Sequence, residues 1–348
     1  MVGVRNRGEK IRKFIINNIE VNAKDIVALT AGQFNISRQA VNAHIKKLVE
    51  QKSITAEGNT RNKIYKLYPL AEHSESFNLS GLEEDRVWRE IIRPKLGALP
   101  DNVMEIWDYG FTEMLNNAID HSQGEYAFVN VKKTQISSEI IITDNGLGIF
   151  TRVRKLLNLY DERHAVLELS KGKLTTDPDN HTGEGIFFSS RMFDEYAILS
   201  GEVYFAHEYN KPEGWIIERE NPATGTTVFM KMSNNSARKT KTIFDNYTSG
   251  DDYCFDKTVV PVSLARYGNE RLVSRSQAKR LLVGVERFKI VIFDFEGIDQ
   301  IGQAFADEVF RVFNNRHPDI QLYFIKTKPD VENMILRALS SRTDASST

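Results

Sequence analysis

Apolar residues recur at helical spacing through the first fifty residues and then alternate with polar ones. Ile11, Phe14, Ile15 and Ile19 fall on one face of a helix. Two further helices are expected over 25–29 and 38–49 with a turn at Gly32, followed by strands over 54–55 and 63–67 around a turn at 57–59. The pattern therefore predicts three helices and a strand pair.

The third of these helices is predicted to present a polar face. Ser37 precedes it and is suited to cap its N-terminus, because a serine hydroxyl accepts a hydrogen bond from a backbone N–H of the first turn. The outward side chains are of the types that bond to base edges and phosphates. They are Arg38, Gln39, Asn42 and Lys46, with Arg61 and Lys63 beside the tip of the strand pair.

Two polar segments divide the rest of the chain. Residues 69–80 and 233–256 lack a clear period, so both are predicted to be linkers. Between them a helical pattern covers 81–121 and is broken near 97–100. Asp101 is the expected N-cap of the second stretch, whose apolar positions are predicted to lie in a core.

Strands and helices alternate in the last third of the chain. Strands are expected over 258–262, 289–295 and 320–325, and helices over 274–286, 304–314 and 331–339. This alternation predicts a small parallel or mixed sheet covered by helices in residues 257–340, followed by a flexible tail over 341–348.

The composition is that of packed globular domains. The 348 residues exceed the roughly 100–200 residues of one domain, which predicts two or three domains. The single cysteine, Cys254, excludes an internal disulfide, and no apolar run approaches the roughly 18 residues that span a bilayer. We therefore expect a cytoplasmic protein without a membrane partner.

The net charge of −1 conceals an asymmetry. Residues 1–68 carry thirteen lysines and arginines against five acids, a net charge of +8, which leaves −9 for the remainder. Clustered basic side chains gain affinity for a phosphate backbone by releasing its counterions. The charge alone fits a polyanion-binding module and a solvated charged face equally.

The order of elements favours the polyanion-binding interpretation. Three helices, a polar face on the third and a strand pair with basic residues at its tip resemble a winged helix-turn-helix DNA-binding domain over residues 1–68. The resemblance implies double-stranded DNA as a partner and favours a homodimer, because such readers often bind two half-sites. The alternative is a winged helix that serves only as a protein-interaction module.

Candidate chemistry is concentrated between residues 113 and 226. Glu113 and Asn117 lie four residues apart on an otherwise apolar helix, so both project from the same face. Burying these polar groups is costly without a partner, which a cation, a phosphate and a polarised water would supply. Asp144 ends a strand expected over 140–143.

Glycines accompany these polar side chains. Gly146 and Gly148 follow Asp144 and let the chain bend tightly beside a ligand. Gly183 and Gly185 precede a helix expected over 187–194, where exposed backbone N–H groups favour a phosphate. Thr226 follows a glycine at the entry to a late strand.

In this order, the four motifs resemble the N, G1, G2 and G3 boxes of the Bergerat-type ATP-binding fold of the GHKL superfamily, over residues 81–232. The stretch EMLNNAIDHS is most similar to the N box of the anti-sigma serine kinases. The resemblance implies ATP and Mg²⁺ as cofactors. It assigns Mg²⁺ to Asn117, activation of the attacking water or hydroxyl to Glu113, and the adenine amino group to Asp144.

The remaining roles follow from the same resemblance. Gly148 would lie beside the base, Thr226 would contact it through water, and Gly183 and Gly185 would approach the phosphates. Residues 150–182 would form a mobile lid. Lys171 and Lys173 lie in that segment, where they would either neutralise phosphate charge or be solvated.

The last third resembles the STAS-like domains that accompany Bergerat-type ATPases in bacteria, most clearly in IVIFDFEGIDQIGQAFADEVFRVF. Related antagonists carry a phosphorylatable serine after the central strand. Ile301 stands at that place and has no hydroxyl, so docking to another domain or a protein partner is expected rather than phosphorylation. Gly302 and Gln303 are read either as docking residues or as a turn and helix cap.

The sequence thus predicts an α+β multidomain protein with an N-terminal winged helix, a central Bergerat α/β sandwich and a C-terminal STAS-like α/β domain. The predicted function is a bacterial ATP-dependent DNA-binding regulator, in which ATP binding and hydrolysis switch DNA or partner binding. Two alternatives remain: a protein serine/threonine kinase that acts on a separate partner, and a non-catalytic nucleotide-binding interaction protein. Phosphohistidine transfer is disfavoured, because a winged helix stands where a histidine kinase has its phosphoacceptor hairpin.

Overall fold

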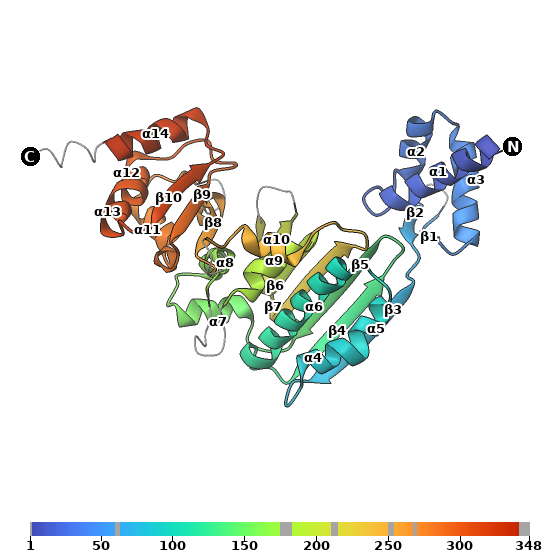
Figure 1. Ribbon diagram of the computed structural model, residues 1–348, viewed down its shortest axis with the longest axis horizontal. Helices are drawn as coiled ribbons and strands as arrows, with labels where there is room; N and C mark the ends of the chain where they lie inside the picture. The colour runs from blue at the N-terminus through green and yellow to red at the C-terminus, as the bar shows by residue number, and fades with distance from the viewer. Residues whose placement is uncertain are drawn as a thin grey trace, which may run out of the picture.

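The computed structural model describes residues 2–59, 63–174, 183–209, 215–249, 254–266 and 270–340. These residues form a small helical unit at the N-terminal end, a central sheet with helices and a second, smaller sheet at the C-terminal end (Figure 1). In the described part of the chain, no helix is long and apolar enough to cross a bilayer.

The N-terminal unit has its own hydrophobic core. It consists of α1 (Val2–Asn18), α2 (Ile26–Phe34), α3 (Arg38–Glu50) and an antiparallel pair, β1 (Ile54–Glu57) with β2 (Ile64–Leu67). Ile15, Ile19 and Val41 are fully buried there. The Ser37 hydroxyl accepts a hydrogen bond from the Ala40 N–H at 3.2 Å, which confirms the predicted N-cap.

The turn predicted at Gly32 is wrong by three residues. Gly32 lies inside α2, and the chain reverses at Asn35, whose φ of 49° is left-handed. Asparagine tolerates this conformation, because its short polar side chain bonds locally. The expected helix over 25–29 therefore extends to Phe34.

The central unit is built on a five-stranded antiparallel sheet in the order β3-β4-β5-β7-β6. The strands are β3 (Ala71–Asn78), β4 (Tyr126–Lys133), β5 (Ser137–Asp144), β6 (Glu195–Glu208) and β7 (Trp215–Ser233). The linker predicted over 69–80 is therefore wrong for residues 71–78, which form an edge strand on β4. An edge strand is held by backbone pairing and needs little apolar alternation, so its polar sequence concealed it.

Helices cover one face of this sheet (Figure 1). They are α4 (Glu84–Val87), η1 (Trp88–Ile92), α5 (Arg93–Leu96), α6 (Asp101–Asn116), η2 (Asn117–His121) and α9 (Gly185–Met192). Trp107 and Phe111 of α6 are fully buried against the sheet. Pro100, rather than the predicted Asp101, occupies the N-cap position of α6, and Asp101 is the first helical residue.

The C-terminal unit confirms the predicted alternation. Three parallel strands lie in the order β10-β9-β8: β8 (Lys257–Pro261), β9 (Ile290–Asp294) and β10 (Gln321–Ile325). The helices around them are η3 (Val262–Ala265), α11 (Arg275–Leu282), η4 (Val285–Arg287), α12 (Gln303–Asp307), η5 (Glu308–Phe313), α13 (Asn314–Arg316) and α14 (Pro329–Ser340). The predicted tail, 341–348, lies outside the described residues.

The central and C-terminal units share one hydrophobic core. The linker predicted over 233–256 contributes to it, because that segment contains α10 (Thr240–Asp245) and the buried Phe255. The centre of the Phe255 ring lies 4.6 Å from the ring centre of Phe187 of α9 and 5.4 Å from that of Phe288 of the C-terminal unit. The segment is therefore part of the interface and is not a free linker.

Two helices between β5 and β6 complete this interface: α7 (Ile149–Leu156) and α8 (Glu162–Lys171). Every residue of α8 from 164 to 171 is buried, and the helix packs against β6 and α9 on one side and β8 and η3 on the other. The Thr258 hydroxyl of β8 donates to the Lys171 carbonyl at 2.8 Å. α8 is therefore held between the two units.

A buried ion pair fixes the end of α8. The Lys171 ammonium donates to Glu168 Oε1 and to the Val283 carbonyl, both at 2.6 Å, and the side chains of Glu168 and Lys171 are each 1% exposed. Burial lowers the pKa of Lys171, and the Glu168 carboxylate opposes that change. The pair links the central unit to the C-terminal unit.

Lys171→Met should destabilise the protein strongly, because removing one partner of a buried pair leaves an uncompensated charge, at a cost of about 3–5 kcal/mol. Thermal unfolding would measure the effect. Lys328→Met is the matched control: its partner is Asp299, both side chains are exposed, and little change is expected.

A double variant tests the cause. Glu168→Leu combined with Lys171→Met removes both charges and should recover most of the lost stability. Equal melting temperatures for Lys171→Met and Lys328→Met would contradict the assignment of a stabilising interface pair.

Candidate functional site: a cavity at the end of β5

Asp144 ends strand β5 as a buried carboxylate, 6% exposed. Its Oδ1 accepts hydrogen bonds from the Gly146 N–H at 2.8 Å and the Thr226 N–H at 3.2 Å. Burial raises the pKa of Asp144, and these hydrogen bonds oppose that change. Both backbone bonds end on Oδ1, so they use only one of the two carboxylate oxygens.

A cavity of about 40 Å³ lies beside this carboxylate. Asn117, Asp144 and Thr226 supply polar groups to its lining. The apolar part of the lining comes from Met114, Ile142, Ile149, Ile186, Ile198 and Val228. The structure thus brings together three predicted site residues that are separated by up to 109 positions in the chain, because residues 117, 144 and 226 lie on η2, β5 and β7.

The glycines after β5 are required by close backbone approach. A Cβ at Gly146 would overlap the Ser122 carbonyl oxygen, and Gly148, with φ +84°, would place a Cβ against the Ser200 hydroxyl at 2.6 Å. Asn145 lies between them, and its Oδ1 accepts from the Glu125 and Tyr126 N–H groups at 2.9 Å each. The loop is thereby fastened to the end of η2 and the start of β4.

Glu113 lies one helical turn before Asn117 and faces the start of α9. A Cβ at Gly185 would overlap the Glu113 carboxylate, so the glycine allows this carboxylate to approach the N-terminus of α9. Gly183, with φ +70°, packs against the Leu174 backbone, and its carbonyl accepts from the Leu174 N–H at 3.2 Å. The structure therefore groups Glu113 with Gly185, whereas Gly183, two residues earlier, contacts Leu174 instead.

The helix that carries Glu113 and Asn117 changes its geometry at this site. α6 is a regular α-helix up to Asn116, and η2 continues it from Asn117 as a wider π-helical turn. Such turns within helices are frequent at functional sites, because they re-aim side chains. Sequence periodicity gave no signal of the change.

Arg152 was not among the predicted site residues. It lies on α7, lines the cavity and donates a hydrogen bond to the His121 carbonyl. The neighbouring Ile149 N–H donates to the Thr226 hydroxyl at 3.0 Å. α7 therefore closes the cavity. A ligand larger than the present volume of the cavity can enter only when α7 shifts.

The burial of Lys171 contradicts both the phosphate role and the solvated alternative for that lysine, whereas Lys173 is half-buried. Lys171 is buried in its pair with Glu168, and the Lys173 ammonium lies 5.7 Å from the Phe255 ring centre and 5.2 Å from that of Phe288. Both lysines point into the interface, because α8 packs on the C-terminal unit. Residues 175–182 of the predicted lid lie outside the described residues.

The candidate nucleic-acid face is separate from this cavity. The four predicted side chains of α3 are exposed, as is Lys63, whereas Arg61 lies outside the described residues. Lys46 is 80% exposed and lies 3.9 Å from Glu50. The opposite face of α3 is buried through Val41, Ile45 and Leu48, so the polar face is free to meet a partner.

A comparison with known families matches only the last third of the chain. A family model described as a STAS-like domain of unknown function matches residues 277–332, from α11 into α14. This part of the chain is a STAS-like domain. No curated protein matches the chain.

Ile301 is the residue for which the sequence resemblance implied a serine position in related antagonists, and it lies between β9 and α12. Ile301 is 6% exposed and pairs with Leu272 in a parallel bridge. Gly302 occupies the N-cap position of α12, and its N–H donates to the Leu272 carbonyl at 2.8 Å. Of the two interpretations of Gly302, the structure therefore supports a turn and cap, and α8 makes contacts with this domain instead.

Gly146→Ala should lower the melting temperature, because the new Cβ meets the backbone of Ser122 and overpacking costs about 1–3 kcal/mol. Gly32→Ala is the matched control. It lies inside α2 with open space around it and should stabilise by about 0.5–1 kcal/mol through helix propensity. Thermal unfolding of both variants measures the difference, and a stabilised Gly146→Ala protein would contradict the tight contact.

Proposed function

We propose that the chain is an ATP-dependent DNA-binding regulator, with a GHKL-type nucleotide site in residues 81–232, a winged-helix DNA reader in 1–68 and the STAS-like domain as a docking module. One observation carries the proposal. Asn117, Asp144 and Thr226 line a single cavity. Glu113 lies one turn from Asn117, against the glycine that begins α9.

The polar groups suit Mg²⁺-bound ATP. The Asp144 carboxylate has an oxygen beyond the two backbone bonds on Oδ1, and it accepts the adenine amino group in this proposal. Asn117 offers an amide oxygen, a hard ligand of the kind that Mg²⁺ takes. The first N–H groups of α9 are proposed to face the phosphates, and the absence of a Cβ at Gly185 lets the Glu113 carboxylate approach the same helix start.

Glu113 is the candidate base. Its carboxylate is placed beside the start of α9, where the terminal phosphate is proposed to lie, so it orients a water molecule and takes its proton. Mg²⁺ neutralises phosphate charge when bound. Ile149 and Arg152 first move aside, because the present cavity is smaller than a nucleotide base.

The contacts of β5 and α8 explain how the site would influence the other units. Ser137 at the first residue of β5 donates to Glu20 Oε1 at 2.7 Å, and Lys231 of β7 contacts Glu20 Oε2 at 3.0 Å. Glu20 follows α1 of the proposed DNA reader. Toward the C-terminal unit, a displacement of α7 would also displace α8, because the two helices are in contact and α8 packs against the STAS-like domain.

Nucleotide binding and turnover test this proposal. Asp144→Asn should weaken ATP binding by roughly 10- to 100-fold, because a charge-assisted acceptor in a buried site is lost. Glu113→Ala should bind ATP normally and lose at least about 100-fold in turnover. Isothermal titration calorimetry and phosphate release measure the two quantities with Mg²⁺ present.

Asp101→Asn is the matched control, since it changes an exposed aspartate on the same helix as Glu113. It should leave both quantities unchanged. Wild-type protein without saturable ATP binding would overturn the nucleotide assignment, as would Asp144→Asn protein that binds like wild type.

The basic face is tested separately with duplex DNA of mixed sequence. Lys46→Ala should weaken binding and reduce the salt slope by about 1, because one phosphate contact is lost. Lys279→Ala changes an exposed lysine of the STAS-like domain and should have no effect. Fluorescence anisotropy at several salt concentrations gives both results, and equal losses in the two variants would contradict a DNA face on α3.

A further inference from the structure

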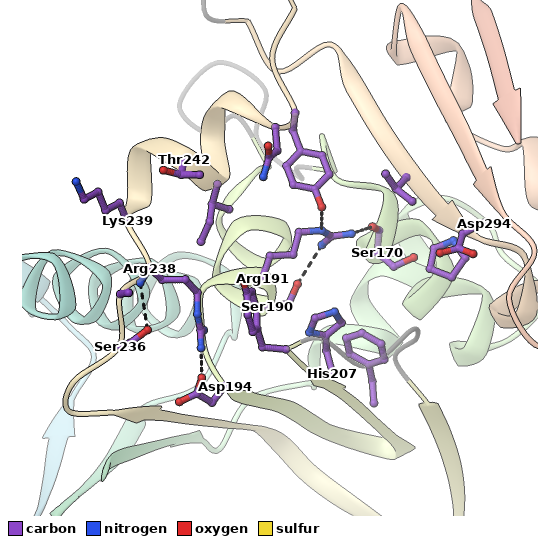
Figure 2. A pocket seen from close by; sticks show the side chains of 18 of the residues that line it. Ser170, Ser190, Arg191, Asp194, His207, Ser236, Arg238, Lys239, Thr242 and Asp294 are labelled. Atoms are coloured by element: carbon purple, nitrogen blue, oxygen red, sulfur yellow. Dashed lines mark hydrogen bonds and ion pairs between the residues drawn. The ribbon is translucent and has the colours of Figure 1, made fainter. Parts of the chain in front are cut away.

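A larger cavity lies between the central unit and the STAS-like domain. It shares no lining residue with the Asp144 cavity. Its volume is about 800 Å³, and α9, β6, α10 and β8 contribute to its wall. Figure 2 shows Arg191 extending toward Ser170 of α8, with His207 below it and Arg238 and Lys239 on the α10 side. The lining is rich in basic and hydroxyl side chains.

Arg191 is the central cation of this cavity. Its guanidinium donates to the Tyr247 hydroxyl at 3.1 Å, to the Ser170 carbonyl at 3.2 Å and to the Phe187 carbonyl at 2.9 Å. It also lies over the Phe187 ring, 3.5 Å from the centre. Arg191 is half-buried, and this burial lowers its pKa.

These partners are all neutral. Among the described residues, no carboxylate forms an ion pair with Arg191, and both acids in the lining are engaged elsewhere. Asp194 pairs with Arg238, and Asp294 pairs with Lys326 at 2.9 Å. A half-buried guanidinium without a counter-charge is stabilised by an anion, and the cavity that Arg191 lines gives an anion access to it.

His207 adds a second polar group. Its ring interacts with the Ser190 backbone, but its buried Nδ1 makes no hydrogen bond. Burial and the nearby Arg191 charge lower the pKa of His207 to about 4, which keeps the imidazole neutral at pH 7. An oxyanion beside Arg191 supplies the partner that this ring nitrogen lacks.

We propose that this cavity binds a small oxyanion, a phosphate or carboxylate group of a metabolite, through Arg191 and His207. Arg191 suits this role because it is a cation with no carboxylate partner among the described residues. It also donates to the Ser190 hydroxyl at 3.1 Å, and one N–H of Nη2 remains beyond its bond to the Ser170 carbonyl. The cavity is large enough for a compact metabolite that carries the anionic group.

The position of Arg191 gives this site a regulatory consequence. Gly185 begins α9 beside Glu113, and Arg191 lies in the last turn of the same helix. An anion bound at Arg191 therefore contacts the helix whose other end forms the proposed phosphate site. It also fills the space between the central unit and β8 of the STAS-like domain. The binding site itself does not depend on the proposed nucleotide function.

Inorganic phosphate and malonate are the probes, added separately to the full chain and followed by isothermal titration calorimetry. Saturable binding of either probe is expected, and the preferred probe identifies the anionic group as phosphate or carboxylate. Arg191→Gln should weaken binding at least tenfold, whereas the same substitution at the exposed Arg316 should leave it unchanged.

Thr242→Trp is a second variant, chosen because Arg191→Gln removes several hydrogen bonds that stabilise the fold. Thr242 is exposed on α10 and lines the cavity, so the larger ring blocks the space and leaves the bonds of Arg191 intact. It should also weaken binding at least tenfold. Absence of saturable binding to wild type overturns the proposal, and so does unchanged affinity in Thr242→Trp, which would place the anion elsewhere, such as at the start of α9.

Discussion

The pairing of β5 with β4 and β7 is the constraint on which the proposed site depends. β5 lies in the middle of the sheet, so its register with both neighbours fixes where it ends. Its last residue, Asp144, pairs with Ala127 on one side and bonds to the Thr226 N–H on the other. A slip of one residue would turn the Asp144 side chain to the opposite face and separate it from Asn117.

The same strand also contacts the N-terminal unit, which keeps its own hydrophobic core. β5 begins at Ser137, which bonds to Glu20 of the N-terminal unit, and it ends at the candidate site. At the other edge of the sheet, β6 and the helix α9 pack against α8, and α8 in turn packs against the STAS-like domain. A shift of α7 and α8 between two packed arrangements would change their contacts with both the central unit and the STAS-like domain, because packed interfaces rearrange in discrete steps.

Local chemistry explains which predictions from the sequence succeeded. The Ser37 cap and the alternation of strands and helices after residue 257 rest on short-range signals, a capping hydroxyl and the local spacing of apolar residues. Asn117, Asp144 and Thr226, which line one cavity, were grouped by the resemblance to the GHKL boxes and not by a local signal. The STAS-like assignment is confirmed over residues 277–332. The nucleotide and DNA roles remain proposals.

The errors arose where tertiary contacts override local pattern. Residues 71–78 are polar yet pair as an edge strand, and Phe255 sits in a polar stretch yet fills the interdomain core. Lys171 resembles a solvated lid residue in sequence, but its ammonium is buried and donates hydrogen bonds to Glu168 and the Val283 carbonyl. The contribution of Arg152 to the cavity also requires the fold, because nothing local marks it.

Coupling between nucleotide and DNA is the central claim, and DNA affinity in three nucleotide states tests it most directly. The dissociation constant for duplex DNA would be measured by fluorescence anisotropy without nucleotide, with ADP and with a non-hydrolysable ATP analogue, each with Mg²⁺. The account predicts at least a fivefold difference between the analogue and the other two states, the lower end of typical allosteric coupling at about 1 kcal/mol. Equal affinity in all three states would contradict an ATP-dependent switch.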